Sequence, residues 1–118
     1  MGNSTDAAVK VNGRTLDVPA YIHNDSVLVP MRPIFEALGA RLDWFPRERK
    51  VVAHKEGQTI RLTVGEGVAY APRPIRLLAR PVMRGDRVFV PLRFVSEALG
   101  ADVHWNARER VARVDARG

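Results

Sequence analysis

The sequence predicts an α+β fold in which an antiparallel β-sheet wraps around two short helices. The first observation is a repeat, because the segment Val27–Trp44 returns 61 positions later as Val88–Trp105. The second is that short runs of alternating apolar and polar residues, typical of half-buried strands, flank one helical apolar stripe in each copy. We therefore expect two pseudo-symmetric repeats, at about 9–56 and 57–117.

The first predicted element is a β-hairpin near the start of the chain. In the run "AVKVNGRTLDV" apolar and polar residues alternate on both sides of Asn12-Gly13. This dipeptide is the strongest short signal for a two-residue hairpin turn. The next strand, Val27–Val29, runs into Pro30, and its counterpart Val88–Val90 runs into Pro91. Proline at this junction suits the end of a strand and the first turn of a helix.

A short amphipathic helix follows each of these prolines. Its apolar stripe consists of Met31, Ile34, Phe35 and Leu38 in the first copy, and of Leu92, Val95 and Leu99 in the second. The spacing predicts one helical face that packs on a sheet. Gly39 and Gly100 come directly after these stripes, where a left-handed residue commonly ends a helix. Pro33 falls in the first turn, where its missing N–H has little effect.

Strand patterns return after each helix. The runs "ARLDW" and "ADVHW" alternate and end at Trp44 and Trp105, and each is followed by an Arg-Glu-Arg turn and a further strand. Between the copies, the pattern predicts strands at residues 59–64 and 68–70, on either side of a turn at Gly65–Gly67. The second copy has Pro72-Arg73-Pro74 where the first has its Asn-Gly turn.

Length and composition favour one globular domain. A chain of 118 residues buries roughly two-thirds of the surface exposed by its unfolded form, whereas a copy of about 55 residues is near the lower limit for a core of its own. No linker-like segment separates the copies, so we expect one domain at 9–118, preceded by a tail or linker at 1–8. The absence of cysteine excludes disulfides and cysteine chemistry. The first residues lack a signal-peptide pattern, so we expect any export signal to lie outside this sequence.

The repeated polar and aromatic residues are expected to be structural. Arg32 and Glu36, like Arg93 and Glu97, are four residues apart on a predicted helix, so each pair can form an ion pair that anchors the helix. The alternative hypothesis, that Glu36 and Glu97 form a catalytic acid–base pair, is less favoured than the structural ion pairs. The tryptophans that end the alternating strands, Trp44 and Trp105, are expected to be buried. The alternative for them is an exposed platform that stacks on sugar rings.

Most of the net charge of +6 comes from one segment, Arg73–Arg93, which holds six arginines and a single acid, Asp86. Clustered arginines attract phosphate and carboxylate regardless of sequence. The candidate polyanion-binding residues are Arg73, Arg76, Arg80, Arg84 and Arg87. A solvated basic surface is the favoured reading, because no aromatic residues are interleaved with these arginines as binding of a single strand of nucleic acid would require.

The sequence holds no recognisable catalytic or metal-binding set. Its histidines, His23, His54 and His104, share no metal-ligand spacing. The turn Gly65–Gly67 lacks the third glycine and the following helix of a dinucleotide site. We therefore expect no enzyme activity, no cofactor and no metal in this chain.

The segment "VNGRTLDVPAYIHNDSVLVPMRPIFEALGARLDW", with its second copy "VMRGDRVFVPLRFVSEALGADVHW", resembles the copper amine oxidase N-terminal domain family, also called the stalk domain. The resemblance covers about Val9 to Val114. Departures from the family pattern are Pro33 and Phe35 in the first copy and Pro72-Arg73-Pro74 in the second, and they affect turn geometry rather than identity.

The resemblance implies a non-catalytic module that is common in exported bacterial proteins and is joined to other domains. In amine oxidases the copper and the quinone cofactor belong to a separate catalytic domain, and neither Tyr21 nor Tyr70 has the Asn-Tyr-Asp/Glu context of the quinone precursor. We expect a structural or accessory role in scaffolding or protein interaction, at the cell envelope or outside the cell. The alternative is a binding module for anionic cell-wall polymer or glycan through Arg73–Arg93.

Overall fold

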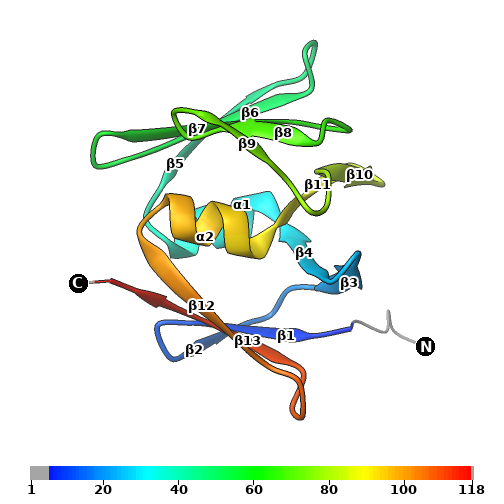
Figure 1. Ribbon diagram of the computed structural model, residues 1–118, viewed down its shortest axis with the longest axis vertical. Coiled ribbons are helices and arrows are strands. Elements are labelled where there is room, and N and C mark those ends of the chain that lie inside the picture. The colour runs from blue at the N-terminus through cyan, green and yellow to red at the C-terminus, as the bar shows by residue number, and fades with distance from the viewer. Residues whose placement is uncertain (1–5, 118) are drawn as a thin grey trace.

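The computed structural model describes residues 6–117 and shows two helices held between two β-sheets, with a third sheet at one side (Figure 1). The helices are α1, Met31–Ala37, and α2, Leu92–Ala98. The strands are β1 Ala8–Val11, β2 Arg14–Leu16, β3 Tyr21–His23, β4 Ser26–Pro30, β5 Arg41–Phe45, β6 Lys50–Lys55, β7 Gln58–Thr63, β8 Val68–Tyr70, β9 Pro74–Arg76, β10 Val82–Arg84, β11 Arg87–Pro91, β12 Ala101–Asn106 and β13 Val111–Ala116. Within residues 6–117 no helix has the length and apolar character needed to cross a membrane.

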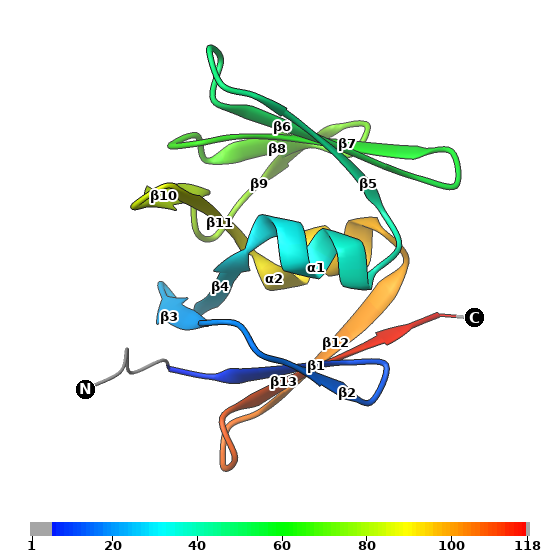
Figure 2. The ribbon, with the colours of Figure 1, turned by 180° about the vertical axis from the view of Figure 1, so that it is seen from behind.

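The α+β class and the mostly antiparallel pairing are confirmed, but the strands do not form the one antiparallel sheet that the sequence predicted. The strands form three sheets, in the order β12-β13-β1-β2 (sheet I), β10-β11-β4-β3 (sheet II) and β5-β6-β7-β8-β9 (sheet III). Sheets I and III lie on opposite sides of the helices, as the view from behind also shows (Figure 2). In sheet I, β1 pairs with β13 in parallel, with Val9 opposite Ala112.

The connectivity explains the parallel pair. Strand β7 lies between β6 and β8 and is antiparallel to both, so the chain can pass from one copy to the next through tight turns. Strands β1 and β13 are the first and last strands of the domain, so no tight turn joins them. Parallel neighbours are joined by a long crossover, and here all the residues between β1 and β13 form that crossover.

The two copies meet at β4 and β11. These strands are antiparallel, with Val29 opposite Val90, Leu28 opposite Pro91, and Pro30 opposite Phe89. Val29 thus lies opposite its own counterpart, Val90, and exchanging the two copies turns the Leu28–Pro91 pair into the Phe89–Pro30 pair, so the register is unchanged.

Both predicted helices are confirmed, and their ends have local causes. Pro30 and Pro91 are extended residues that directly precede α1 and α2. At the end of α1, Gly39 has a φ of 79° and its N–H donates to Glu36 O, while the Ala40 N–H donates to Phe35 O. This pair of bonds is a Schellman motif, which requires a left-handed residue that glycine adopts without strain. Gly100 ends α2 in the same conformation, with a φ of 89°.

The predicted hairpin at Asn12-Gly13 is also confirmed, since both turn residues have positive φ and Val11 lies opposite Arg14. Sequence reasoning missed β3 and β10, which are three residues long and lie at the two edges of sheet II. Strands this short hold too few alternating residues to give a pattern.

The domain begins earlier than the sequence suggested. Ala7 is buried and β1 starts at Ala8. The Asp6 carboxylate accepts the Ile22 N–H at 2.8 Å, and the Asp6 carbonyl accepts from Arg110 Nε at 2.7 Å. Residues 6–8 are therefore part of the fold, because partners distant in sequence hold them. Residues 1–5 of the predicted tail lie outside the described part of the chain.

One continuous core contains apolar side chains from both copies. Its largest fully buried members are Phe35, Ile34, Ile60, Leu62, Leu92, Val9, Val29, Val51, Val90, Val95 and Val114. A smaller cluster of Leu28, Ala79 and Phe89 lies apart from it. Among residues 6–117 one buried residue is polar: Ser96 is fully buried, and its Oγ has no hydrogen-bond partner in this part of the chain. The corresponding position of the first copy holds Phe35.

We predict that Ser96→Ala raises the free energy of unfolding by about 1 kcal/mol, because a buried hydroxyl without a partner carries an uncompensated desolvation penalty of this order. Urea denaturation followed by circular dichroism measures the change. The control is Ser26→Ala, at a half-buried serine of β4, which should change stability less. A loss of stability in Ser96→Ala would show that the hydroxyl is bonded.

Candidate functional site

Two grooves open on the surface, one beside each helix. Groove 1 has a volume of about 360 Å³ and is lined by Pro30, Met31, Arg32, Pro33, Glu36, Trp44, Met83, Asp86, Arg87 and Val88. Groove 2 has a volume of about 640 Å³ and is lined by α2, β12, the β3–β4 hairpin, β9 and the residues that follow β9. Each groove combines the helix of one copy with a hairpin of the other.

The grooves correspond residue by residue. Each of the ten residues that line groove 1 has a counterpart 61 positions away that lines groove 2. The strand tryptophans, Trp44 and Trp105, correspond in this way, as do Arg32 and Arg93 on the helices. The hairpin residue Met83 corresponds to Ile22. The two grooves therefore share ten corresponding lining positions.

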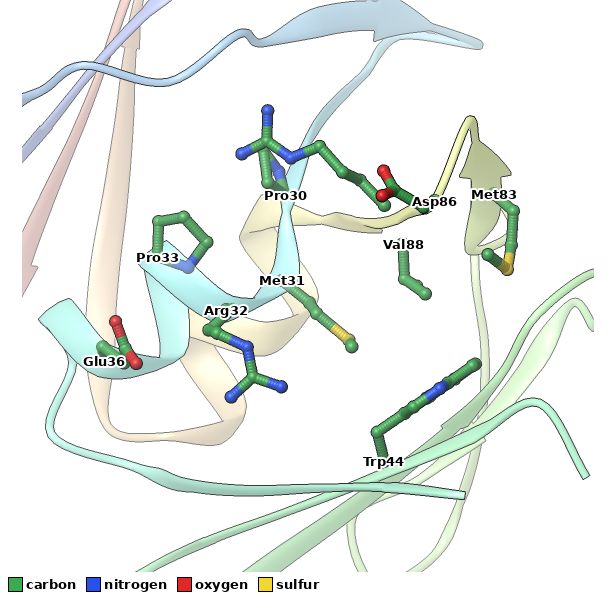
Figure 3. A pocket seen from close by; sticks show the side chains of 10 residues that line it. Pro30, Met31, Arg32, Pro33, Glu36, Trp44, Met83, Asp86 and Val88 are labelled. Carbon is green, nitrogen blue, oxygen red and sulfur yellow. The ribbon is translucent and has the colours of Figure 1, made fainter. Parts of the chain in front are cut away.

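Groove 1 is the smaller of the two. Figure 3 shows Met31 and Arg32 directed from α1 toward the strand that carries Trp44, with Met83 on the hairpin at the other side. Met31 is buried, and Trp44 is half-buried and packs against the main core. Methionine side chains are long and flexible and readily fill irregular space.

Groove 2 keeps large apolar side chains in contact with solvent. Six large apolar side chains are exposed among the described residues, and three of these line groove 2: Ile75 at 38%, Leu78 at 77% and Trp105 at 37%. The groove also has Leu92 and Ile22 where groove 1 has its two methionines. Clefts of a few hundred Å³ with mainly apolar walls are the usual binding sites of proteins.

The prediction that both tryptophans are buried is wrong for Trp105. Both residues lie on edge strands, β5 and β12, that follow a helix. Both tryptophan side chains line a groove. The exposure of each indole ring also depends on residues of the other copy that line the same groove. The local sequence around each tryptophan does not predict which residues these are.

The repeated ion pair forms in only one copy. Arg93 Nη1 lies 3.2 Å from Glu97 Oε2 and 3.4 Å from Val103 O, so it connects α2 to β12. Both side chains are about half exposed, so the pair contributes only a few tenths of a kcal/mol. Arg32 and Glu36 are not among the ion pairs formed within residues 6–117; both line groove 1. Glu36 and Glu97 line different grooves and do not form one acid–base site.

The structure does not bring the five candidate polyanion-binding arginines together at one site, although Arg84 and Arg87 lie opposite each other in the β10–β11 hairpin. All five are exposed. Arg73 lies in the β8–β9 turn, Arg76 lines groove 2, and Arg87 lines groove 1. Arg80 donates to Gly65 O at 3.2 Å, and the Arg84 guanidinium lies 4.2 Å from the centre of the Tyr21 ring. These residues therefore border different surface features.

The histidines lie apart in the fold. His23 ends β3 and His104 is in β12, whereas His54 of β6 lies 3.6 Å from Asp43 Oδ2 and 3.1 Å from Thr59 Oγ1. This last arrangement is on an exposed sheet surface outside both grooves. Within residues 6–117 no three histidine or acidic residues are grouped so that they could hold a metal ion.

Comparison with known proteins agrees with the resemblance seen in the sequence. A family model described as copper amine oxidase N-terminal domain matches residues 10–114. A curated relative named protease inhibitor, from Brevibacillus choshinensis, is 29% identical over 102 residues, which are 84% of this chain and 31% of that protein. The chain thus spans about a third of the length of this relative.

We predict that Trp44→Ala destabilises the domain more than Trp105→Ala. Truncation of a buried tryptophan lowers the free energy of unfolding by about 3–5 kcal/mol, so each partly exposed ring should lose less than this, and Trp44, which packs against the main core, should lose more than Trp105. Urea denaturation of both variants measures the difference. Equal losses would contradict the unequal packing of the two rings.

Proposed function

The chain belongs to the copper amine oxidase N-terminal domain family, and from this premise we propose that it is a structural or accessory module of an exported or cell-surface bacterial protein. In this proposal the module mediates scaffolding or protein interaction and is joined to other domains. The family is a non-catalytic domain, so any chemistry of a longer protein would belong to its other parts.

The observation that carries this proposal is groove 2. It is open, mainly apolar and lined by three of the exposed large apolar side chains. Exposed apolar patches of this kind on a protein mark interaction sites. A protein that inhibits a protease must contact another protein, so the name of the relative from Brevibacillus choshinensis also supports an interaction role.

The fold suits such a module. We infer that the two copies are related by a pseudo-twofold axis near the Val29–Val90 pair, which the exchangeable register of β4 and β11 supports. The correspondence of the two groove linings supports the same relation. In a symmetric scaffold of this kind, the residues of one groove can serve mainly for packing while those of the other groove bind a partner.

The second candidate function is binding of anionic cell-wall polymer or glycan. It is favoured by the exposure of Arg73, Arg76, Arg80, Arg84 and Arg87 and by the excess of basic residues in this segment. The distribution of these arginines over different surface features favours general attraction rather than one specific site.

The localisation can be tested on the full-length protein that contains this chain. We predict that fractionation of cells producing it, followed by immunodetection, recovers the protein from the envelope or the medium. A cytoplasmic marker enzyme serves as the control for lysis. Recovery together with that marker would contradict an exported module.

Binding to heparin at increasing salt tests the second candidate function. We predict weak binding that falls steeply with salt, because neutralised charges release counterions. The double variants Arg73→Gln/Arg76→Gln and Arg84→Gln/Arg87→Gln should lose affinity to the same extent as the control Arg47→Gln/Arg49→Gln, whose arginines are also exposed. A control that keeps full affinity while the other two lose it would indicate a specific site in the segment.

A further inference from the structure

Groove 2 has walls that groove 1 lacks. Beyond the residues shared by both grooves, it is lined by Ile75, Arg76, Leu77, Leu78, Val103, Ala107, Arg110 and Ala112. Most of these are apolar, and Leu78 is the most exposed of the large apolar side chains in the described residues. Ten of the lining residues have counterparts in groove 1, whereas this additional lining belongs to groove 2 alone.

Three edge strands border groove 2. These are β3 of sheet II, β9 of sheet III and β12 of sheet I, each the last strand of its sheet. An edge strand presents N–H and C=O groups that have no partner within its sheet. Some of these groups are already bonded, because the Ile22 N–H of β3 donates to Asp6 and the Val103 C=O of β12 accepts from Arg93. A peptide would therefore bond to the remaining groups. An extended peptide can bond to such groups and place alternate side chains into neighbouring pockets. The borders of groove 2 therefore suit an extended chain.

The rim of groove 2 is basic. It has three arginines, Arg76, Arg93 and Arg110, and two acids, Asp25 and Glu97. Arg93 is paired with Glu97. Within residues 6–117 neither Arg76 nor Arg110 is in an ion pair, and the contact of Arg110 with the Asp6 carbonyl leaves its charge in place. Groove 1, by contrast, is balanced, with two arginines and two acids.

We propose that groove 2 binds an extended, acidic peptide segment of a partner protein or domain. Large apolar side chains of this peptide enter the groove beside Ile75, Leu78 and Trp105, and its carboxylates meet Arg76 and Arg110. The proposal rests on the proposed interaction function and names the ligand class of that function.

The lining favours a peptide over a sugar chain. A sugar needs several hydrogen-bonding side chains along with an aromatic platform, whereas twelve of the eighteen residues that line groove 2 are apolar. Most of these are aliphatic, and they suit leucine, valine or phenylalanine side chains. Trp105 is the one exposed ring in the groove.

Tryptophan fluorescence tests the proposal, because each groove holds one of the two tryptophans of the chain. In the variant Trp44→Phe, Trp105 is the only emitter. The probe is a synthetic peptide with alternating phenylalanine, threonine and leucine between acidic ends. The expected result is a saturable blue shift of Trp105 emission. The converse variant Trp105→Phe, which reports from groove 1, should show no shift.

Three substitutions assign the contacts. Leu78→Asp should weaken binding by about tenfold or more, because loss of an exposed apolar contact and repulsion of the acidic ends act together. Arg76→Gln should weaken binding of the acidic peptide and leave a peptide with neutral ends unaffected. Arg47→Gln, at an exposed arginine far from groove 2 in sequence and not among its lining residues, is the control and should bind as the parent does.

Four results would overturn the proposal. The first is no shift of Trp105 emission with the acidic peptide, and the second is equal binding of a peptide with lysine ends. The third is a response to a heparin hexasaccharide but not to peptide, and the fourth is a concentration-dependent shift without peptide that sedimentation assigns to a dimer. The third result would indicate a glycan and the fourth a second copy of this chain. A negative peptide result together with recovery from the envelope or medium would reject the ligand and retain the exported module.

Discussion

The antiparallel pairing of β4 with β11 holds the two copies of the repeat together, because each helix begins at the residue after one of these strands. A seven-residue helix is too short to be stable alone, so α1 and α2 depend on the core that they share. The register matters as much as the pairing. Val29 and Val90 belong to the main core while Leu28 and Phe89 belong to the smaller cluster, so a slip of one residue would exchange the two sets.

The same pairing makes the grooves. Since β4 and β11 lie side by side, the hairpin of each copy stands next to the helix of the other, and each groove is built from both copies. A change in one copy therefore alters the groove beside the other copy's helix. Met83, from the second copy, lines the groove that contains Trp44, and Ile22, from the first, lines the groove that contains Trp105.

This arrangement separates the requirements of folding from those of binding. The apolar stripe, the proline before the helix and the glycine after it recur in both copies because both helices need them. Of the residues that line only groove 2, Ala112, Leu77 and Val103 also contribute to the main core. Ile75 and Leu78 are exposed, and together with Arg76 and Arg110 they give groove 2 a surface that groove 1 lacks.

The sequence by itself determined the local elements. The predicted helices, the predicted hairpin turn and the predicted helix ends agree with the structure, at Met31, Leu92, Asn12-Gly13, Gly39 and Gly100. They could be predicted because apolar spacing and backbone preference depend on only a few neighbouring residues. It also identified the family and most of the residues that recur in both grooves.

Only the tertiary structure decided the rest. The parallel pairing of β1 with β13, the anchoring of Asp6 by Arg110 and the placement of Arg76 and Arg87 at different grooves depend on which distant segments become neighbours. The different environments of Trp44 and Trp105 have the same origin. Similar local patterns place both rings beside a groove, and the surroundings of each ring depend on which distant segments come to line that groove.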